Sequence, residues 1–306
     1  MNIIDTFRYL VALEEHKHFS RAAQACHITQ PALSNALKSL EEEMRIKIVN
    51  RGRNYEGLTE EGVRVLNSAY QVLNEIDRLK TEIGSKKESP TGNLTIGSIP
   101  SALPVASSFA ASIHTRYKGL KPVVRSMTSH DIDLCLENLS VDIAFGYSER
   151  LSTQSQEVEV IPQYGEKYFF LSKKKGESRG EPLTWREASK NDLCLLTSEM
   201  HNRKLIDIFF AKNNIQIDPV MQTDSIFSLL LTVYNAQVST ILSGPTANFA
   251  KANGELEIRE LVDPSETTAI GIMIPGSNRL SIVQNAVKLY CESQDWKKIL
   301  NDISMP

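Results

Sequence analysis

The sequence predicts an α+β protein of several domains: an N-terminal winged helix-turn-helix, a long linker helix and a larger α/β domain. Three observations support this fold class. Two short helical segments joined by a turn lie near the N-terminus, a coiled-coil pattern follows, and the remaining two thirds alternate between strand-like and helix-like segments. A chain of 306 residues is also longer than one compact core usually holds, so we expect more than one domain.

The N-terminal segment has the pattern of a helix-turn-helix. Residues 5–17 place apolar side chains at helical spacing, and Ser20 is positioned to cap a second, short helix. The chain breaks at residues 27–29, and a third helix starts at Gln30 and Pro31, where the missing N–H of proline costs nothing. Two short helices joined by such a turn form the motif that places a recognition helix in the major groove of DNA.

A basic segment follows the third helix. Residues 45–54 contain no acidic residue, and Gly52 and Gly57 bracket a turn, so we interpret the segment as a basic wing. Its cations are Arg45, Lys47, Arg51 and Arg53.

Residues 59–84 are predicted to form one long helix that starts after the capping residue Thr59. Its apolar positions lie alternately four and three residues apart, which is coiled-coil spacing. These positions are Val65, Ala69, Val72, Ile76, Leu79 and Ile83. One helix cannot bury such a seam alone, so we expect a partner helix, most simply from a second copy of the chain. The polar segment 85–92 is the predicted hinge.

The remaining residues alternate between short apolar runs and helical segments, which is typical of an α/β domain with a mostly parallel sheet. The predicted strands cover residues 94–97, 123–127, 141–146, 168–171, 193–197 and 239–242.

Composition excludes several classes of protein. The net charge of −3 is not that of a strongly basic nucleic-acid binder, and residues 1–90 hold 13 basic and 13 acidic residues, so any DNA-binding surface must be a local cluster. No apolar run approaches the roughly 18–20 residues that span a bilayer, so we expect no membrane segment. The N-terminus lacks the basic and apolar regions of a secretory signal.

The four cysteines lie far apart in the sequence, at positions 26, 135, 194 and 291. This spacing excludes a disulfide framework and the usual zinc sites, and it suggests a reducing cytoplasm. We therefore expect no metal and no cofactor. Cys194 lies inside the apolar run 193–196, so we interpret it as a small buried hydrophobic residue.

Two other functional classes fit this sequence less well than a DNA-binding protein does. An enzyme on an α/β scaffold needs a recognisable nucleophile, metal or phosphate motif, and none occurs; Ser172–Lys175 fits SxxK formally but is interpreted as a solvated turn. A ligand-binding transport component predicts a signal peptide and no helix-turn-helix, and neither feature agrees with this sequence. We therefore predict a protein that is not an enzyme.

The N-terminal residues resemble the LysR-type transcriptional regulators. The resemblance rests on motifs that keep the order and spacing of the family over about 55 residues, and the linker helix and α/β domain extend the same plan over the whole chain. The motifs are Phe19-Ser20-Arg21-Ala22-Ala23, Thr29-Gln30-Pro31-Ala32-Leu33-Ser34, Leu40-Glu41-Glu42-Glu43, Arg51 and Leu58-Thr59-Glu60-Glu61-Gly62.

The resemblance implies a sequence-specific DNA-binding regulator with a winged helix-turn-helix over residues 1–58 and a dimerising linker helix over 59–84. Amide and hydroxyl side chains at the start of the recognition helix suit base edges and phosphates, and the wing arginines suit flanking phosphates or the minor groove. The implied DNA-binding residues are Ser20, Gln30, Pro31, Ser34, Asn35, Lys38, Arg51 and Arg53. Many members have arginine where this chain has Asn35, and glycine where it has Arg45.

The resemblance further implies an effector-binding domain over residues 93–306 that is similar to the periplasmic binding proteins. Lobe I is expected over 93–162 and 268–306, and lobe II over 163–267, with a small effector, most simply an anion, in the cleft. Hydroxyls at strand-to-helix junctions suit such a ligand, although each could instead be an ordinary helix cap. The expected effector-binding residues are Ser101, Thr128, Ser129, Thr197, Ser198 and His201.

The resemblance implies that the chain binds double-stranded promoter DNA and that the effector regulates promoter occupancy or DNA bending. It also implies that further copies of the chain are partners, in a dimer or homotetramer. RNA polymerase is a candidate partner, and the expected location is the bacterial cytoplasm, at the nucleoid. Peroxide sensors of this family need a second cysteine near Cys194 in lobe II, but the next is Cys291, so that activity is not expected.

Overall fold

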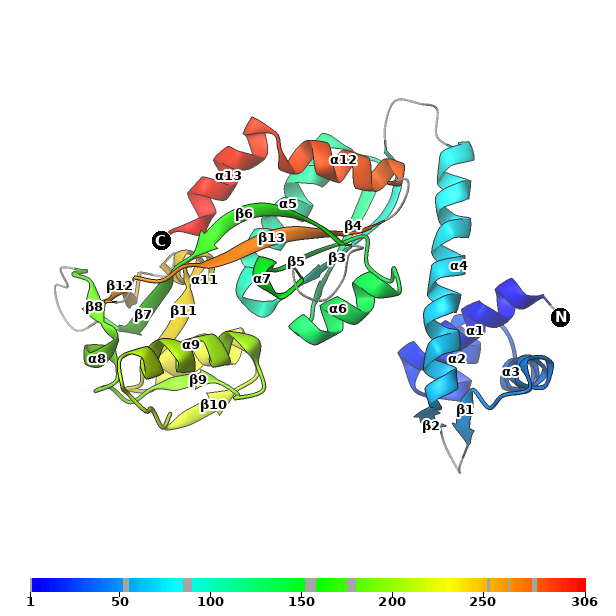
Figure 1. The fold of residues 1–306 in the computed structure, drawn as a ribbon, viewed down its shortest axis with the longest axis horizontal. Coiled ribbons are helices and arrows are strands. Elements are labelled where there is room, and N and C mark those ends of the chain that lie inside the picture. The colour runs from blue at the N-terminus through cyan, green and yellow to red at the C-terminus, as the bar shows by residue number, and fades with distance from the viewer. Residues whose placement is uncertain are drawn as a thin grey trace. The chain divides into compact units, whose positions relative to one another are not determined.

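The computed structural model describes residues 2–306 except 52–54, 85–89, 152–157, 175–179, 252–253, 264 and 277–279. The chain forms two compact units. One comprises residues 1–87 with the short segment 137–140, and the other comprises residues 88–136 and 141–306. Figure 1 shows the elements of both units.

The N-terminal unit is a helix-turn-helix domain with a β-hairpin and a long helix. Its elements are α1 (Ile3–His16), α2 (Phe19–Ala25), α3 (Gln30–Met44), β1 (Val49–Arg51), β2 (Tyr55–Leu58) and α4 (Glu60–Gly84). One face of each helix is apolar, so the helices bury a common core that includes Leu10, Leu13, Leu33, Leu37 and Leu40. The antiparallel pair β1–β2 is the wing that the basic segment predicted.

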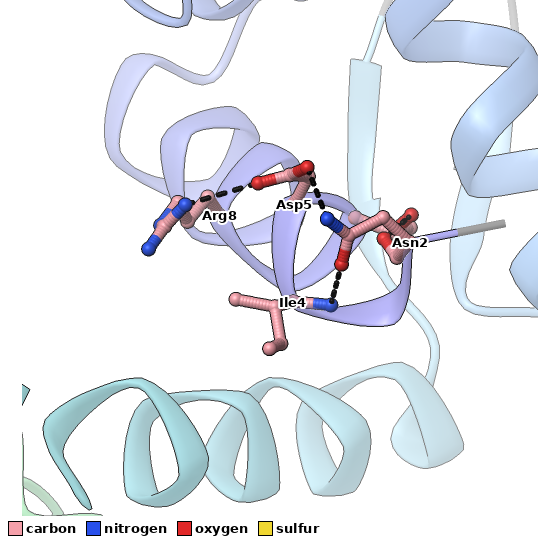
Figure 2. A network of polar contacts seen from close by, with 5 residues as sticks. Asn2, Ile4, Asp5 and Arg8 are labelled. Atoms are coloured by element: carbon pink, nitrogen blue, oxygen red, sulfur yellow. Dashed lines mark hydrogen bonds and ion pairs between the residues drawn. The ribbon is translucent and has the colours of Figure 1, made fainter. Parts of the chain in front are cut away.

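A side-chain network fixes the start of α1 (Figure 2). Asn2 is the N-cap, and its Oδ1 accepts a hydrogen bond from the backbone N–H of Ile4 at 3.2 Å. Its Nδ2 donates to Asp5 Oδ2 at 2.6 Å, and Arg8 Nη1 donates to the other oxygen of Asp5 at 3.0 Å. The cap satisfies a helix N–H that has no partner within the helix.

The start of α4 is held close to the strand β1. Thr59 Oγ1 caps the helix by accepting from the N–H of Gly62 at 2.9 Å, as the sequence predicted. A Cβ atom at Gly62 would lie 2.1 Å from the carbonyl oxygen of Ile48. Only glycine fits here, which gives a physical reason for the Leu58-Thr59-Glu60-Glu61-Gly62 motif.

The larger unit has two lobes, named here by their sheets. Lobe I contains the five-stranded sheet β4-β3-β5-β13-β6. Its strands are β3 (Gly92–Ser98), β4 (Leu120–Ser126), β5 (Ile143–Tyr147), β6 (Val158–Glu166) and β13 (Thr268–Pro275). Its helices are the 3₁₀ turn η1 (Pro100–Ala102), α5 (Leu103–Arg116), α6 (Ser129–Glu137), α7 (Ser148–Leu151), α12 (Ile282–Cys291) and α13 (Gln294–Ser304). Phe109 packs edge-on against Phe145 and Trp296 in the core of this lobe.

Lobe II contains the sheets β11-β7-β12-β8 and β10-β9. Its strands are β7 (Tyr168–Lys173), β8 (Leu183–Thr184), β9 (Cys194–Leu196), β10 (Met221–Thr223), β11 (Thr240–Ser243) and β12 (Leu256–Val262). Its helices are α8 (Trp185–Ala188), α9 (His201–Lys212), α10 (Ile226–Asn235) and α11 (Gly244–Lys251). Tyr168 and Phe170 pack into one core cluster, whereas Phe169 and Leu171 pack into another. Strand β7 is therefore buried on both faces, which explains its continuous apolar run.

The expectation of mostly parallel sheets was only partly right. Strand β3 is parallel to β4 and β5, but β13 is antiparallel to both β5 and β6, and β7 is antiparallel to β11 and β12. The chain crosses between the lobes twice in opposite directions, so the two crossing strands must pair antiparallel. Figure 1 shows β6 and β13 side by side from lobe I into lobe II, and Pro162 lies inside β6 rather than at its end.

We expect Gly62→Ala to destabilise the N-terminal unit. The added methyl group would overlap the Ile48 carbonyl, so α4 or the segment before β1 must move, at a cost of about 1–3 kcal/mol. Hydrogen exchange of the amides of α1–α3 in the full-length chain measures the loss as a lower opening free energy. The exposed neighbour Glu61→Ala is the control and should stay within about 0.5 kcal/mol of wild type. Equal protection in Gly62→Ala and wild type would contradict this packing.

Candidate functional site

Helix α3 presents one apolar face to the core and one polar face to solvent. Thr29 is its N-cap, with Oγ1 accepting from Ala32 N at 3.4 Å, and Pro31 lies in its first turn. Leu33, Leu37 and Leu40 are buried, which fixes the rotation of the helix about its own axis. The opposite face is therefore held outward by packing of the core.

The polar face of α3 contains most of the residues expected to bind DNA. Gln30, Pro31, Asn35 and Lys38 are exposed, and Ser34 is half-buried among them. Their spacing puts them along one side of the helix, from its first turn onward. The Lys38 ammonium lies 3.8 Å from a carboxylate oxygen of Glu42, but both side chains are more than 60% exposed, at 63% and 68%, so Lys38 remains available to phosphates.

The remaining expected DNA contacts lie outside α3. Ser20 is exposed within α2, but the prediction that it caps this helix was wrong. The N-cap is His18, whose Nδ1 accepts from Ser20 N at 3.2 Å, and histidine is not among the usual caps. Arg51 ends β1, but its side chain and all of Arg53 lie outside the described residues.

Glu41, a residue of the family motif, has a structural role that the sequence did not reveal. Glu41 Oε1 accepts from the backbone N–H groups of Ile48 and Val49, at 2.9 and 3.0 Å. This carboxylate therefore ties α3 to the start of the wing. Arg45, between them, adopts a left-handed conformation with φ 55°, at the position where the family often has glycine.

The coiled-coil positions of α4 divide into two groups. Ala69 is fully buried and Val65 partly buried, both against the core of their own unit, so a second copy cannot cover them. Val72 and Leu79 are 40% and 54% exposed, and Ile76 is intermediate. The side chain of Ile83 lies outside the described residues. The seam open to a partner helix is therefore confined to the second half of α4.

A small cavity of about 20 Å³ lies between the two lobes of the larger unit, with room for about one water molecule. Four of the six expected effector-binding residues line it: Ser101, Thr128, Ser129 and His201. They meet because strands β3, β4 and β9 end on the cleft and a helix or turn follows each one. Thr197 and Ser198 are not among its lining residues.

The two helices that start at this cavity differ at their N-termini. Thr128 Oγ1 accepts from Asp131 N at 3.1 Å and donates to Asp131 Oδ2 at 2.8 Å, so α6 is capped by its own side chains. Helix α9 has Met200 as its N-cap and no side-chain cap. Met200 thus gives the first turn of α9 no side-chain cap, and the positive end of the helix dipole favours an anion at this position.

Two cavity residues were missed from the sequence. The hydroxyl of Tyr147, at the end of β5, lies 3.3 Å from Ser101 Oγ and accepts from Asn202 Nδ2 at 3.4 Å. Its ring packs against that of His201 in a tilted arrangement, with centroids 4.7 Å apart. Burial, followed by the nearby Glu166, raises the pKa of Tyr147, so the phenol stays neutral. The predicted strand stopped at residue 146, one residue short of this tyrosine.

A second, larger groove of about 820 Å³ lies between α5 of lobe I and α10 and α11 of lobe II. Its walls are mostly apolar, and Phe227 and Phe249 are each 70% exposed. The strands β4 and β10 lie at edges of their sheets, with Val123 and Met221 exposed. Exposed aromatic rings next to open sheet edges are typical of surfaces that another protein covers.

The described residues give little support for a reactive cysteine or a metal site in the larger unit. Cys194 lies in β9 within the core of lobe II, and Cys291 lies in α12 within the core of lobe I. Burial raises the pKa of both thiols, that of Cys291 to about 12. Among the described residues, no group of three or more His, Cys, Asp or Glu side chains could hold a metal ion. In the same part of the chain, no helix is long and apolar enough to cross a membrane.

Comparison with known proteins gives matches to both units. Residues 4–63 match the family model described as "Bacterial regulatory helix-turn-helix protein, lysR family", and residues 87–292 match "LysR substrate binding domain". The hydrogen peroxide-inducible genes activator of Pectobacterium carotovorum subsp. carotovorum is 33% identical over 145 residues, or 47% of this chain and 48% of the relative. The regulator LrrA of Synechococcus elongatus is 29% identical over 64% of this chain and 65% of its own. The chain thus matches about half the length of the first of these relatives.

Solved structures with the same fold include a full-length OxyR variant from Pseudomonas aeruginosa, with a TM-score of 0.70 at 19% identity over 98% of this chain and 99% of the other. Full-length CbnR in complex with its target DNA has a TM-score of 0.68 at 13% identity, over 94% of this chain and 98% of CbnR.

We expect Cys194 and Cys291 to resist hydrogen peroxide in the native protein. The thiolate is the reactive form, and burial with a raised pKa leaves little of it. Mass spectrometry of peptides from peroxide-treated protein, digested without reductant, measures this. The same treatment in denaturant is the control and should oxidise both. A Cys194–Cys291 disulfide formed in the native protein would contradict the prediction.

Proposed function

The chain belongs to the LysR family of bacterial transcriptional regulators, and we propose that it binds promoter DNA as a dimer or tetramer under the control of a small effector. The observation that carries the proposal is the exposed polar face of α3, whose rotation is fixed by the buried Leu33, Leu37 and Leu40. A rigid helix with amide, hydroxyl and ammonium groups on one side suits a major groove.

The affinity for DNA depends on more than one copy of the chain. Residues 1–90 carry no net charge, so the electrostatic attraction of one domain for phosphates is weak. Pairing two domains turns the second contact into an intramolecular one and strengthens binding without new contacts. The partly exposed second half of α4, with Val72 and Leu79, supports pairing of two helices, and the paired domains would read a dyad-symmetric site.

The effector proposal rests on the cavity between the lobes. The uncapped start of α9, the hydroxyls of Ser101 and Ser129 and the His201 ring come from both lobes and suit a small organic or inorganic anion. An effector that contacts both lobes favours one arrangement of them over another. Such a shift would change DNA occupancy or bending. Thr197 and Ser198 remain candidate contacts only for a ligand larger than the present cavity.

We propose that a tetramer forms through the groove between α5 and α10. Exposed Phe227 and Phe249, with the open edges of β4 and β10, offer an apolar surface that a second copy of the effector domain could bury. RNA polymerase remains a candidate partner, and the proposed location is the bacterial cytoplasm, at the nucleoid.

The peroxide response named for several relatives is not proposed here. It would require a reactive thiol, and the two buried cysteines lie in the separate cores of the two lobes.

We expect wild type to protect a dyad-symmetric site in the chain's own upstream DNA, and the double variant Gln30→Ala/Ser34→Ala to lose that protection at matched salt. Each lost base contact should cost about 1–3 kcal/mol. Footprinting measures both proteins on the same fragment. Gln294→Ala, in α13, is the control and should protect like wild type. Equal protection by the double variant would mean that α3 does not read the site.

We expect Leu79→Lys to weaken self-association. Removing one buried leucine from each side of a paired seam costs about 2 kcal/mol, or about 30-fold in the dimer dissociation constant. Sedimentation velocity over a concentration series measures this constant. Ser68→Lys adds the same charge at an exposed position in the first half of α4, before the open part of the seam, and should leave the constant unchanged. Equal weakening by both variants would indicate a charge effect and contradict the seam.

A further inference from the structure

The last residue of β6, Glu166, is a carboxyl group buried where the two lobes join. It pairs across the strands with Thr268, the first residue of β13, so it lies where both crossing strands pass between the lobes. The residue has no solvent exposure, and neither carboxyl oxygen has a hydrogen-bond partner in the described part of the chain. An ionised carboxylate in this position would be unfavourable, because burial removes its hydration.

Hydroxyl groups from both lobes face this carboxyl but are engaged elsewhere. Ser101 of lobe I and Ser243 and Tyr168 of lobe II lie near enough to lower its pKa, against the larger effect of burial. Ser243 Oγ, however, donates to the backbone oxygen of Ser101 at 3.1 Å, and the Tyr168 hydroxyl lies 3.3 Å from Thr268 Oγ1. Each hydroxyl has one proton to donate, so little is left to stabilise a carboxylate.

The titratable groups that face Glu166 are phenols. They are Tyr164 on its own strand, Tyr147 on β5 and Tyr168 on β7, and burial raises the pKa of each. The turn η1 and the strands β11 and β13 contribute the hydroxyls of Ser101, Ser243 and Thr268. These phenols and hydroxyls supply no charge of either sign.

No cation is among the described groups that shift the pKa of Glu166, and two cations on neighbouring elements pair with other groups. Lys167, the next residue in the chain, donates to Glu260 on β12 at 2.7 Å. Arg203 on α9 donates to Asp207 at 2.8 Å and to the backbone oxygen of Leu196. Burial without a neighbouring cation therefore raises the pKa of Glu166 from 4.5 to about 8.

The environment that keeps Glu166 neutral depends on contacts between the lobes. The bond from Ser243 to Ser101 joins lobe II to lobe I, and so do the contacts of Tyr147 with Asn202 and His201. Opening the cleft would break these contacts and let water reach the carboxyl, which would then ionise at an ordinary pKa.

We propose that closing of the two lobes takes up one proton from solvent at the Glu166 carboxyl, so that effector binding in the cleft is coupled to pH. The regulatory consequence rests on the proposed function, whereas the proton uptake does not. On closing, the proton moves from water to a carboxyl oxygen; on opening, it returns to water. The coupling is reciprocal, because any ligand that favours the closed arrangement also favours the protonated acid.

The direction of the pH dependence of closing follows from the raised pKa of Glu166. The closed arrangement binds the proton more tightly than the open one, so below about pH 4.5 both are protonated and closing carries no cost from this group. As pH rises from about 4.5 to 8, closing becomes less favourable, by up to about tenfold in its equilibrium constant per pH unit. Above about pH 8 the equilibrium constant for closing no longer changes with the titration of this group.

The test uses full-length protein without DNA or effector, so its failure is distinct from failure of the DNA-binding proposal. Hydrogen exchange, corrected for intrinsic rates, follows the amides of β6, β13 and the start of α9 from pH 5.5 to 8.5. We expect protection in wild type to fall with pH and in Glu166→Gln, the neutral isostere, to stay flat. Asp142→Asn is the matched control: Asp142 is a half-buried carboxyl whose pKa is also raised, to about 6, but it lies between β3 and β5 in lobe I, so the fall should remain.

A second measurement does not depend on the folding of a variant. Infrared difference spectra of wild type with ¹³C-labelled glutamate should contain the C=O band of a protonated carboxylic acid at pH 7, and this band should disappear as pH is raised above about 8. Absence of that band at pH 7, or equal pH dependence in wild type and Glu166→Gln, would overturn the proposal.

Discussion

The antiparallel pairing of β6 with β13 is the constraint on which the larger unit depends. The pair runs the full length of both strands, from Val158 opposite Pro275 to Glu166 opposite Thr268. It is part of the sheet of lobe I, and its far end delivers the chain into β7, so both lobes are built outward from it. Contacts across the cleft, such as that of Tyr147 with Asn202, join the two lobes that these strands connect. A two-strand connection also allows the lobes to rotate while the ladder stays intact.

In the N-terminal unit, the packing of a small core fixes the direction of one helix, α3. Its core depends on α4, because Leu66 and Ala69 complete the packing of α1 and the wing is tied to α3 by Glu41. The same helix therefore stabilises its own domain with its first turns and leaves only later turns for a partner. This division accounts for an apolar seam that is longer than the surface available for pairing.

Features that depend on neighbouring residues in the sequence could be predicted. Features that depend on contacts between distant segments could not. The start of α3 followed from the break at residues 27–29 and from Pro31, and strand ends that carry Ser101 and Ser129 could be expected to meet at one edge. Tyr147, Asn202 and Glu166 gave no such signal, because their neighbours come from distant segments joined by the antiparallel strands. Ser20 was misjudged as a cap because the competing cap, His18, is of an unusual type.

The electrostatics of the cleft link its two unusual features. The uncapped start of α9 favours a negative ligand, yet a buried carboxyl lies behind the same residue, Ser101, that lines the cavity. An ionised Glu166 would repel an anion in this low-dielectric region, whereas the neutral acid would not. Under the proposed function, anion binding in the cavity and proton uptake at the junction would therefore favour each other, because the closed lobes would hold one buried negative charge rather than two. The protonation state of Glu166, together with the shape of the cavity, would then decide which ligands stabilise the closed arrangement.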